Sequence, residues 1–191
     1  YEKYKDTDPQ MEQILHPRAL DDAGAMCCAM MKASVGEPEL QLDSLIENYF
    51  HFIEKVQYRL PDGTFARHRP QHNTVWLDDM FMGVPSIAYR GIYKPEEAQK
   101  YFDESAKISM QFVRRMFVSE KNLYRHGFVE GLHQQPTYHW ARANGWAILT
   151  NCEVLDALPE DHPQREALLE QLRLHIKGLA NYQSSEGFWH Q

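Results

Sequence analysis

The sequence WLDDMFMGVPSIAYRG, from Trp76 to Gly91, is the stretch around which the chain is organised. It places two adjacent acids, Asp78 and Asp79, among large apolar residues, where a carboxylate is costly to remove from water unless it is paired or used. One explanation is a helix N-terminus at which one of these acids caps the free backbone amides. The other is a functional site, and two similar segments elsewhere in the chain favour it.

The similar segments are LDDAGAMCCAMM, from Leu20 to Met31, and WARANGWAIL, from Trp140 to Leu149. All three are apolar, rich in small residues and preceded by polar groups, which predicts short buried helices. A longer amphipathic segment with apolar residues at helical spacing follows each of them. The expected short helices are Leu20–Ala33, Trp76–Tyr93 and Arg142–Leu158, and the expected long ones are Leu40–Val56, Pro95–Ser119 and Pro163–Gln183.

Each long segment leads into a turn that contains an aromatic residue, so the chain repeats with a period of about 60 residues. The turns are Asp62-Gly63-Thr64-Phe65, Lys121-Asn122-Leu123-Tyr124 and Glu186-Gly187-Phe188-Trp189. Inner and outer helices in alternation describe an all-α toroid of helical hairpins. Because three hairpins leave an open edge, we expect residues 1–191 to form a single domain that is a fragment of a longer barrel, or else to self-associate as a homo-oligomer.

Composition excludes several classes of function. A formal net charge of −7 argues against a nucleic-acid footprint and gives no attraction to an anionic membrane. No apolar run approaches the roughly 20 residues that span a bilayer, and no signal peptide opens the chain. Cys27, Cys28 and Cys152 lie in apolar helical stretches, and we expect buried free thiols. These features predict a cytoplasmic protein, or a periplasmic one if a signal peptide precedes this chain.

The loops before the inner helices should all emerge at one end of the toroid. Carboxylates, imidazoles, an arginine and several indoles converging there suit an anionic sugar, because tryptophan stacks on a ring, arginine pairs with a carboxylate and an acid donates a proton. The expected residues are Asp21, Asp22, Trp76, Asp78, Asp79, His139, Trp140, Arg142, Asn144 and Trp146, with His126 and His190 added by the turns.

Other kinds of site lack sequence support. No HExxH motif or CxxC pair occurs, so no metal site is expected, and no glycine-rich phosphate loop or GxSxG elbow is present. The remaining histidines that we considered are expected to be surface or capping groups; these are His68, His72, His162 and His175.

Four ordered motifs resemble one known family. LDDAGAMCCAMM, WLDDMFMGVP, WARANGW with VLDALPEDHPQRE, and EGFWHQ are similar to segments of the unsaturated glucuronyl and rhamnogalacturonyl hydrolases, glycoside hydrolase families 88 and 105. The resemblance covers the chain from about His16 onward. It implies an (α/α)6 barrel of which this chain holds about half, and it implies no metal or organic cofactor.

The resemblance also implies the chemistry. The substrate would be an acidic oligosaccharide left by a polysaccharide lyase, with an unsaturated uronate at its non-reducing end. A carboxylic acid protonates C4 of the C4=C5 double bond, water adds at C5, and the hydrated sugar opens and releases its neighbour. Burial raises the pKa of a carboxyl group, as this step needs. Adjacent helical residues point about 100° apart, so only one of Asp78 and Asp79 can face the sugar, and we favour Asp79.

One position departs from the family pattern. The family places its acid/base aspartate where this chain has Val129, within RHGFVEG, and Glu130 is the next residue. Three explanations stay open: Glu130 takes over, His126 acts with one of the two aspartates, or the protein is a non-catalytic carbohydrate-binding or regulatory relative. Other enzymes of the toroid class form a further alternative. By the family pattern, the sugar site would be lined by Arg142, Asn144 and Trp146.

Overall fold

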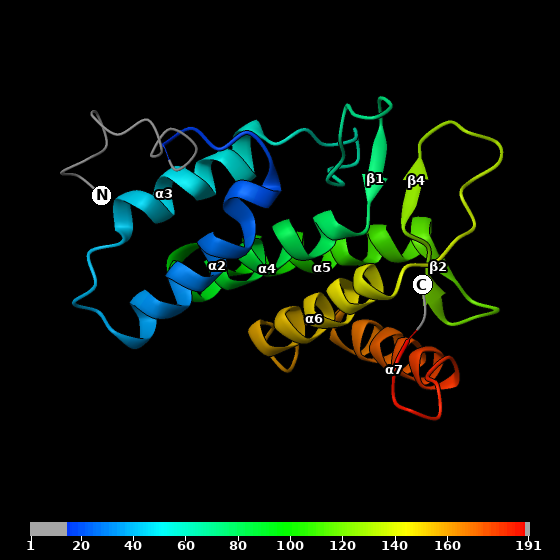
Figure 1. The fold of residues 1–191 in the computed structure, drawn as a ribbon. Coiled ribbons are helices and arrows are strands. Elements are labelled where there is room, and N and C mark those ends of the chain that lie inside the picture. The colour runs from blue at the N-terminus through cyan, green and yellow to red at the C-terminus, as the bar shows by residue number, and fades with distance from the viewer. Residues whose placement is uncertain (1–14, 190–191) are drawn as a thin grey trace.

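The structure, a computed structural model that describes residues 15–189, consists mainly of three helical hairpins (Figure 1). The inner helices are α2 (Leu20–Gly36), α4 (Asp78–Tyr93) and α6 (Ala141–Ala157). The outer helices are α3 (Asp43–His51) with the π-helical turn η2 (Phe52–Val56), α5 (Ala98–Met116) after the 3-10 turn η3 (Pro95–Glu97), and α7 (Arg165–Asn181).

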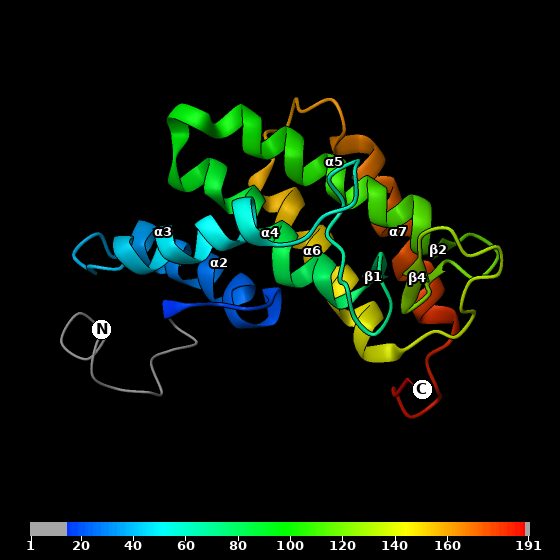
Figure 2. The same cartoon turned by 90° about the horizontal axis from the view of Figure 1, so that it is seen from above.

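Helix α4 is central because it packs against α2 on one side and α6 on the other. The three inner helices run in the same direction, and each outer helix returns alongside its partner (Figures 1 and 2). The predicted order of hairpins, with adjacent and parallel inner helices, is therefore confirmed. The first turns of α4 and α6, which contain Asp79 and Asn144, lie at the same end of the arc.

Small residues allow α2 and α4 to touch. A Cβ atom placed on Gly24 would lie 1.3 Å from the carbonyl oxygen of Met82, so no larger residue fits there without moving a helix. The Ser86 hydroxyl donates a hydrogen bond of 2.6 Å to the Gly24 carbonyl in the same contact. The small-residue composition of the inner helices is thus explained by close backbone approach.

The three aromatic turns share one backbone feature. Each contains a residue with positive φ, which glycine and asparagine adopt most readily, and an aromatic residue two positions later. The pairs are Gly63 (φ 96°) and Phe65, Asn122 (φ 55°) and Tyr124, and Gly187 (φ 87°) and Trp189. The first two aromatic rings are fully buried, whereas the third is 42% exposed at the last hairpin.

Two short antiparallel sheets, which the sequence did not predict, add to the helical framework. Strand β1 (Thr74–Trp76) pairs with β4 (Gly127–Val129), with Trp76 opposite Gly127, and β2 (Phe117–Val118) pairs with β3 (Leu123–Tyr124). The β1–β4 pair joins the loop before α4 to the loop before α6 (Figure 1). It thereby brings the flanking side chains of both loops together.

The burial of some residues corrects the sequence analysis. Cys27 and Cys28 are buried free thiols as expected, but Cys152, in α6, is exposed. His175 is fully buried and not a surface group; its Nε2 bonds to Asn144 and burial lowers its pKa to about 4. His162 fits a capping role, since its Nδ1 accepts from the Gln164 amide before α7. Within residues 15–189, no helix is long and apolar enough to cross a membrane.

Candidate active site

The two aspartates of the central stretch occupy the first turn of α4, which begins after Leu77. Neither side chain caps the helix, because no side-chain hydrogen bond forms at its N-terminus. The capping explanation is therefore not supported for this pair. Asp22 of α2 does act as a cap, since its Oδ2 accepts from the backbone amides of Arg18 and Ala19.

Asp79 is bound by an arginine. Its carboxylate is 1% exposed and accepts from Arg67 Nε at 2.9 Å and Arg67 Nη2 at 2.6 Å, while the same Nη2 also donates to Asp21 at 3.0 Å. Burial raises the pKa of Asp79 to about 6, against the opposing effect of Arg67. Asp79 therefore joins α4 to the loop that carries Arg67, and its carboxylate has little contact with solvent.

Asp78 points to a different neighbour. Its Oδ2 lies 3.4 Å from Nδ1 of His126, and both atoms are buried without a hydrogen-bond partner. Burial lowers the pKa of His126, and the charges of Arg142 and Arg67 lower it further while Asp78 raises it. Buried polar atoms without partners are rare in folded proteins. Asp78 and His126 therefore form a close pair that keeps unused hydrogen-bonding capacity, which makes it a candidate for proton transfer.

Two tryptophans flank His126, and each is covered by an arginine. The His126 ring centroid lies 5.6 Å from that of Trp76 and 4.9 Å from that of Trp140. Arg67 lies 4.5 Å from the Trp76 ring centroid, and Arg142 lies 3.9 Å from that of Trp140. Arg142 is exposed and forms no ion pair with any residue of the described range. Its guanidinium group is thus available for an anion.

A cavity of about 200 Å³ opens beside this cluster, with Trp76, His126, Val129 and Tyr138 in its lining. Val129 occupies the position at which the family resemblance places an aspartate, so the cavity wall is apolar there. The carboxylate of Glu130 is bound to Arg115 of α5 at 3.1 Å, and Glu130 is not among the lining residues of this cavity. The hypothesis that His126 acts with an aspartate fits this geometry better.

Asn144 has a structural position instead of the expected position in the sugar site. It is 2% exposed; its Oδ1 accepts from the Tyr124 amide and contacts His175 Nε2, and its Nδ2 donates to the Tyr124 and Trp140 carbonyls. All its hydrogen-bonding groups are therefore engaged within the protein. Through these hydrogen bonds, Asn144 fixes the first turn of α6 against the aromatic turn that precedes it.

The other predicted residues divide between the site and its surroundings. Trp146 is partly exposed and stacks on Phe81 at 4.9 Å, between α6 and α4. His139 bonds through Nδ1 to the Tyr124 carbonyl at 2.8 Å and lines a separate cavity of about 120 Å³. His190 lies outside the described residues.

Arg67 is a site residue that the sequence pattern did not predict. A buried acid needs a partner, and the stretch between the first aromatic turn and Trp76 offers Arg67 and Arg69 as cations, which was the available signal. Which of Arg67 and Arg69 pairs with the buried acid depends on the fold, because the loop must turn back onto α4. Among residues 15–189, no group of three or more His, Cys, Asp or Glu side chains could hold a metal ion.

Comparison with known proteins identifies the family of the chain. The family model described as Glycosyl Hydrolase Family 88 matches residues 1–191. The chain is 26% identical over 118 residues to an unsaturated 3S-rhamnoglycuronyl hydrolase of Alteromonas sp. (strain LOR), a match that covers 60% of this chain and 28% of that protein. It is 26% identical over 144 residues to the unsaturated rhamnogalacturonyl hydrolase YesR of Bacillus subtilis (strain 168), which covers 73% and 37% respectively.

A solved structure gives the fold. The glycoside hydrolase from family 105 of C. acetobutylicum matches with a TM-score of 0.77 at 21% identity, over 91% of this chain and 49% of that one. The match confirms the expected toroid of helical hairpins, and the chain spans about half the length of that structure. It spans still less of the curated relatives it matches.

Proposed function

The chain belongs to glycosyl hydrolase family 88. From this membership and the Asp78–His126 pair, we propose that the chain is part of a glycoside hydrolase that acts on unsaturated uronyl groups. The substrate would be an acidic oligosaccharide with an unsaturated uronic acid at its non-reducing end. The two named relatives, an unsaturated 3S-rhamnoglycuronyl hydrolase and an unsaturated rhamnogalacturonyl hydrolase, support this substrate class.

The observation that carries the proposal is the set of unsatisfied atoms between two tryptophans. Asp78 Oδ2 and His126 Nδ1 lie 3.4 Å apart without hydrogen-bond partners, and the ring centroids of Trp76 and Trp140 lie 5.6 Å and 4.9 Å from that of the imidazole. An indole face binds the apolar face of a sugar ring. The free guanidinium of Arg142 suits the uronate carboxylate, since arginine and carboxylate form charge-assisted hydrogen bonds.

The proposed reaction adds one water across the C4=C5 double bond. The Asp78–His126 pair donates a proton to C4, and a water molecule adds its oxygen to C5 while its proton returns to the pair. The resulting hemiketal at C5 opens and releases the neighbouring sugar, and the pair ends in its starting protonation state. General acid–base groups of this kind contribute roughly 10²- to 10⁴-fold to a rate.

Asp78 replaces our sequence-based preference for Asp79 as the proton donor in this proposal. The raised pKa of Asp79 suits an acid, but its carboxylate is 1% exposed and its two oxygens are bound by Arg67. A group enclosed in this way holds the loop in place more easily than it reaches a substrate. We assign Asp79 a positioning role.

Substitution of each candidate acid tests the assignment. The Asp78→Asn and His126→Gln variants should lose roughly 10²- to 10⁴-fold in kcat with substrate binding largely kept, as followed by loss of the ultraviolet absorbance of the conjugated uronate. Glu130→Gln is the matched control and should keep its rate, because Glu130 is bound to Arg115. Full activity in both Asp78→Asn and His126→Gln would refute the assignment.

The same assay separates catalysis from binding alone. If the unaltered protein quenches its tryptophan fluorescence with an unsaturated disaccharide but never removes the absorbance, the non-catalytic carbohydrate-binding alternative is correct. Val129 at the cavity wall is the feature that favours this second candidate. The experiment therefore decides between the two functions with one substrate.

The wider context of the chain is also a proposal. Exposed apolar side chains on the last hairpin, among them Leu149, Ile176 and Trp189, support a ring that continues with further hairpins or with a second copy of the chain. The three free thiols support a reducing compartment, the cytoplasm. The negative net charge supports the absence of nucleic-acid and membrane partners.

A further inference from the structure

His175 is a fully buried histidine that the proposed reaction does not use. It belongs to α7, and its ring meets that of Tyr124 edge-on, with the ring centroids 4.9 Å apart. Helix α7 also touches the second aromatic turn directly, because a Cβ atom on Gly178 would lie 2.1 Å from the carbonyl oxygen of Asn122. Since His175 Nε2 contacts Asn144 of α6 as well, the imidazole is enclosed between α7, α6 and this turn.

The hydrogen bonds of Asn144 determine which nitrogen of His175 carries the proton. Asn144 Nδ2 lies 2.9 Å from the Tyr124 carbonyl and 3.1 Å from the Trp140 carbonyl, and a carbonyl oxygen only accepts, so Nδ2 is a donor to both. Asn144 Oδ1 is then an acceptor, and His175 Nε2, 3.0 Å away, donates to it. Nδ1 of His175 is buried without a hydrogen-bond partner among the residues that the structure describes. Because burial lowers the pKa of His175 to about 4, its imidazole is neutral near pH 7.

Asn144 connects this buried contact to the first turn of α6. The Trp140 carbonyl accepts from the Asn144 amide at 3.0 Å and from Asn144 Nδ2 at 3.1 Å, and no side-chain hydrogen bond within the described chain caps this helix. Arg142 lies 3.9 Å from the centroid of the Trp140 ring, which itself lies 4.9 Å from that of His126. The turn that carries Trp140 and Arg142 is thus fixed through Asn144.

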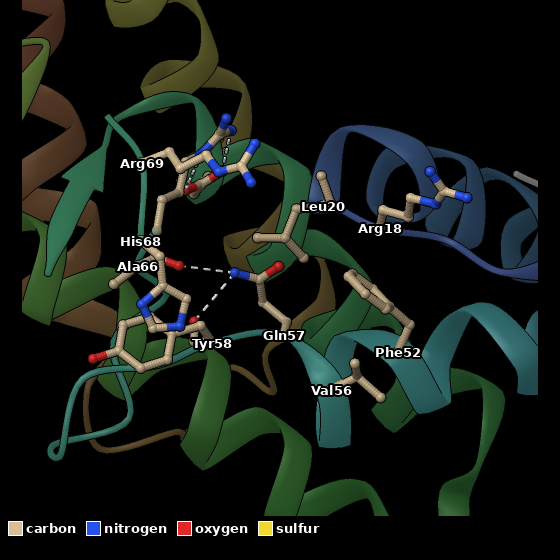
Figure 3. Close-up of a pocket in the computed structure, with 12 residues that line it drawn as sticks. Arg18, Leu20, Phe52, Val56, Gln57, Tyr58, Ala66, His68 and Arg69 are labelled. Atoms are coloured by element: carbon tan, nitrogen blue, oxygen red, sulfur yellow. Dashed lines mark hydrogen bonds and ion pairs between the residues drawn. The ribbon is translucent and has the colours of Figure 1, made fainter. Parts of the chain in front are cut away.

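Other contacts hold the reacting pair. Its carboxylate belongs to α4, and the His126 carbonyl accepts from the Leu77 amide, just before that helix, at 3.0 Å. The loop before α4 has contacts of its own, among them a hydrogen bond of 2.9 Å from Gln57 Nε2 to the Ala66 carbonyl (Figure 3). None of these contacts involves α6 or α7. A change at His175 should therefore affect the residues for sugar binding and leave the reacting pair in place.

We propose that His175 is a positioning residue for substrate binding, which through Asn144 holds Trp140 and Arg142 in the orientation that binds the first sugar. A neutral imidazole suits this role, because it donates one hydrogen bond and brings no charge into the core. The inference rests on the proposed function for the identity of that sugar. It extends the site to α7, which supplies none of the groups that we place at the reacting pair or at the sugar.

Kinetics of variants on α7, with an unsaturated disaccharide as substrate, test the proposal. His175→Leu removes the donor at similar volume and should raise KM by roughly tenfold, the equivalent of one hydrogen bond, with kcat little changed. His175→Gln should keep KM near its original value, because the new side-chain amide can still donate to Asn144. Gln171→Leu is the matched control: it removes a buried donor to the Tyr124 hydroxyl one turn earlier, and should lower the thermal unfolding midpoint without raising KM.

NMR measurements without turnover separate this inference from the proposed function. The indole N–H signal of Trp140, assigned by comparison with Trp140→Phe, should move in His175→Leu but not in His175→Gln or Gln171→Leu. The same pattern in a protein that hydrolyses no unsaturated disaccharide would support the positioning role and reject the proposed function alone. The imidazole nitrogen shifts of the unaltered protein add a test that does not depend on the folding of His175→Leu, and they should show a proton on Nε2 of His175 and none on Nδ1 near neutral pH.

Three results would overturn the proposal. The first is a proton on Nδ1 of His175 in place of Nε2. The second is an unmoved Trp140 signal in His175→Leu. The third is a rise in KM that is equal in His175→Leu and Gln171→Leu, or as large in His175→Gln as in His175→Leu, since a purely structural role predicts either.

Discussion

The burial of Asp79 predicts a specific change in stability with pH. Its pKa is raised from 3.8 to about 6, mainly because burial disfavours the charged form, so the folded protein binds a proton here more tightly than the unfolded chain does. The contribution of Asp79 to stability is therefore complete below about pH 4. It is lost as the pH rises to about 6 and stays absent above that value.

The size of this loss follows from the two pKa values. Each pH unit between them is worth about 1.36 kcal/mol, so the free energy of unfolding should fall by about 3 kcal/mol across the interval on account of Asp79 alone. Other carboxylates titrate in the same range and add a background. The Asp79→Asn variant lacks the titrating proton but keeps the background, so the difference between the two proteins isolates the effect.

Urea unfolding at several pH values between 4 and 7, followed by tryptophan fluorescence, measures that difference. Relative to the unaltered protein, Asp79→Asn should gain about 3 kcal/mol between pH 4 and pH 7. Arg67→Gln should behave in the opposite way: it leaves a buried carboxylate unpaired and should cost about 3–5 kcal/mol at pH 7 and less at pH 4, where Asp79 is neutral. Parallel pH curves for all three proteins would refute the reasoning.

Two further predictions concern packing and reactivity. Gly24→Ala should lower the free energy of unfolding by at least about 2 kcal/mol, because the added carbon would lie 1.3 Å from the Met82 carbonyl oxygen. Gly36→Ala is the control and should cost little in the same urea assay, since nothing lies within 4 Å of its added carbon. Equal effects of the two changes would contradict the close α2–α4 contact. A thiol reagent should label only Cys152 in the folded protein and all three cysteines in urea, as counted by mass spectrometry. Because partial burial raises the pKa of Cys152, its labelling should become faster as the pH rises. Rapid labelling of the two other thiols in the native state would show that α2 opens readily.

The helices were predictable because their signals are local. Three apolar segments at a period of about 60 residues, each followed by an amphipathic segment, determined the order of the hairpins, and the observed bounds of α4 and α6 differ from the expected ones by at most two residues. The strands β1 and β4 were not predictable. Each has three residues and pairs with a partner more than fifty positions away, and no local pattern marks such a contact.

The candidate site was predictable in its residue types but not in their orientation. Trp76, His126 and Trp140 come together because β1 pairs with β4, a contact absent from the sequence pattern. Asn144 has a side chain typical of sugar sites, yet its position faces the turn at Tyr124, where backbone groups would otherwise lack partners. The packing of α6 on α7 and on the turn decides whether this asparagine binds a sugar or pairs with the backbone.

The separation of Asp78 from Asp79 follows from helix geometry once both neighbours are known. Consecutive residues on a helix point about 100° apart, so two adjacent carboxylates at the start of α4 meet different loops. One loop, before α4, carries Arg67 and binds Asp79, while the other, before α6, carries His126 and meets Asp78. A strong fixed cation holds one acid in place, and a titratable imidazole leaves the other with unsatisfied atoms. The two adjacent acids therefore have different partners, an arginine for Asp79 and an imidazole for Asp78, and our proposal assigns the chemistry to Asp78 alone.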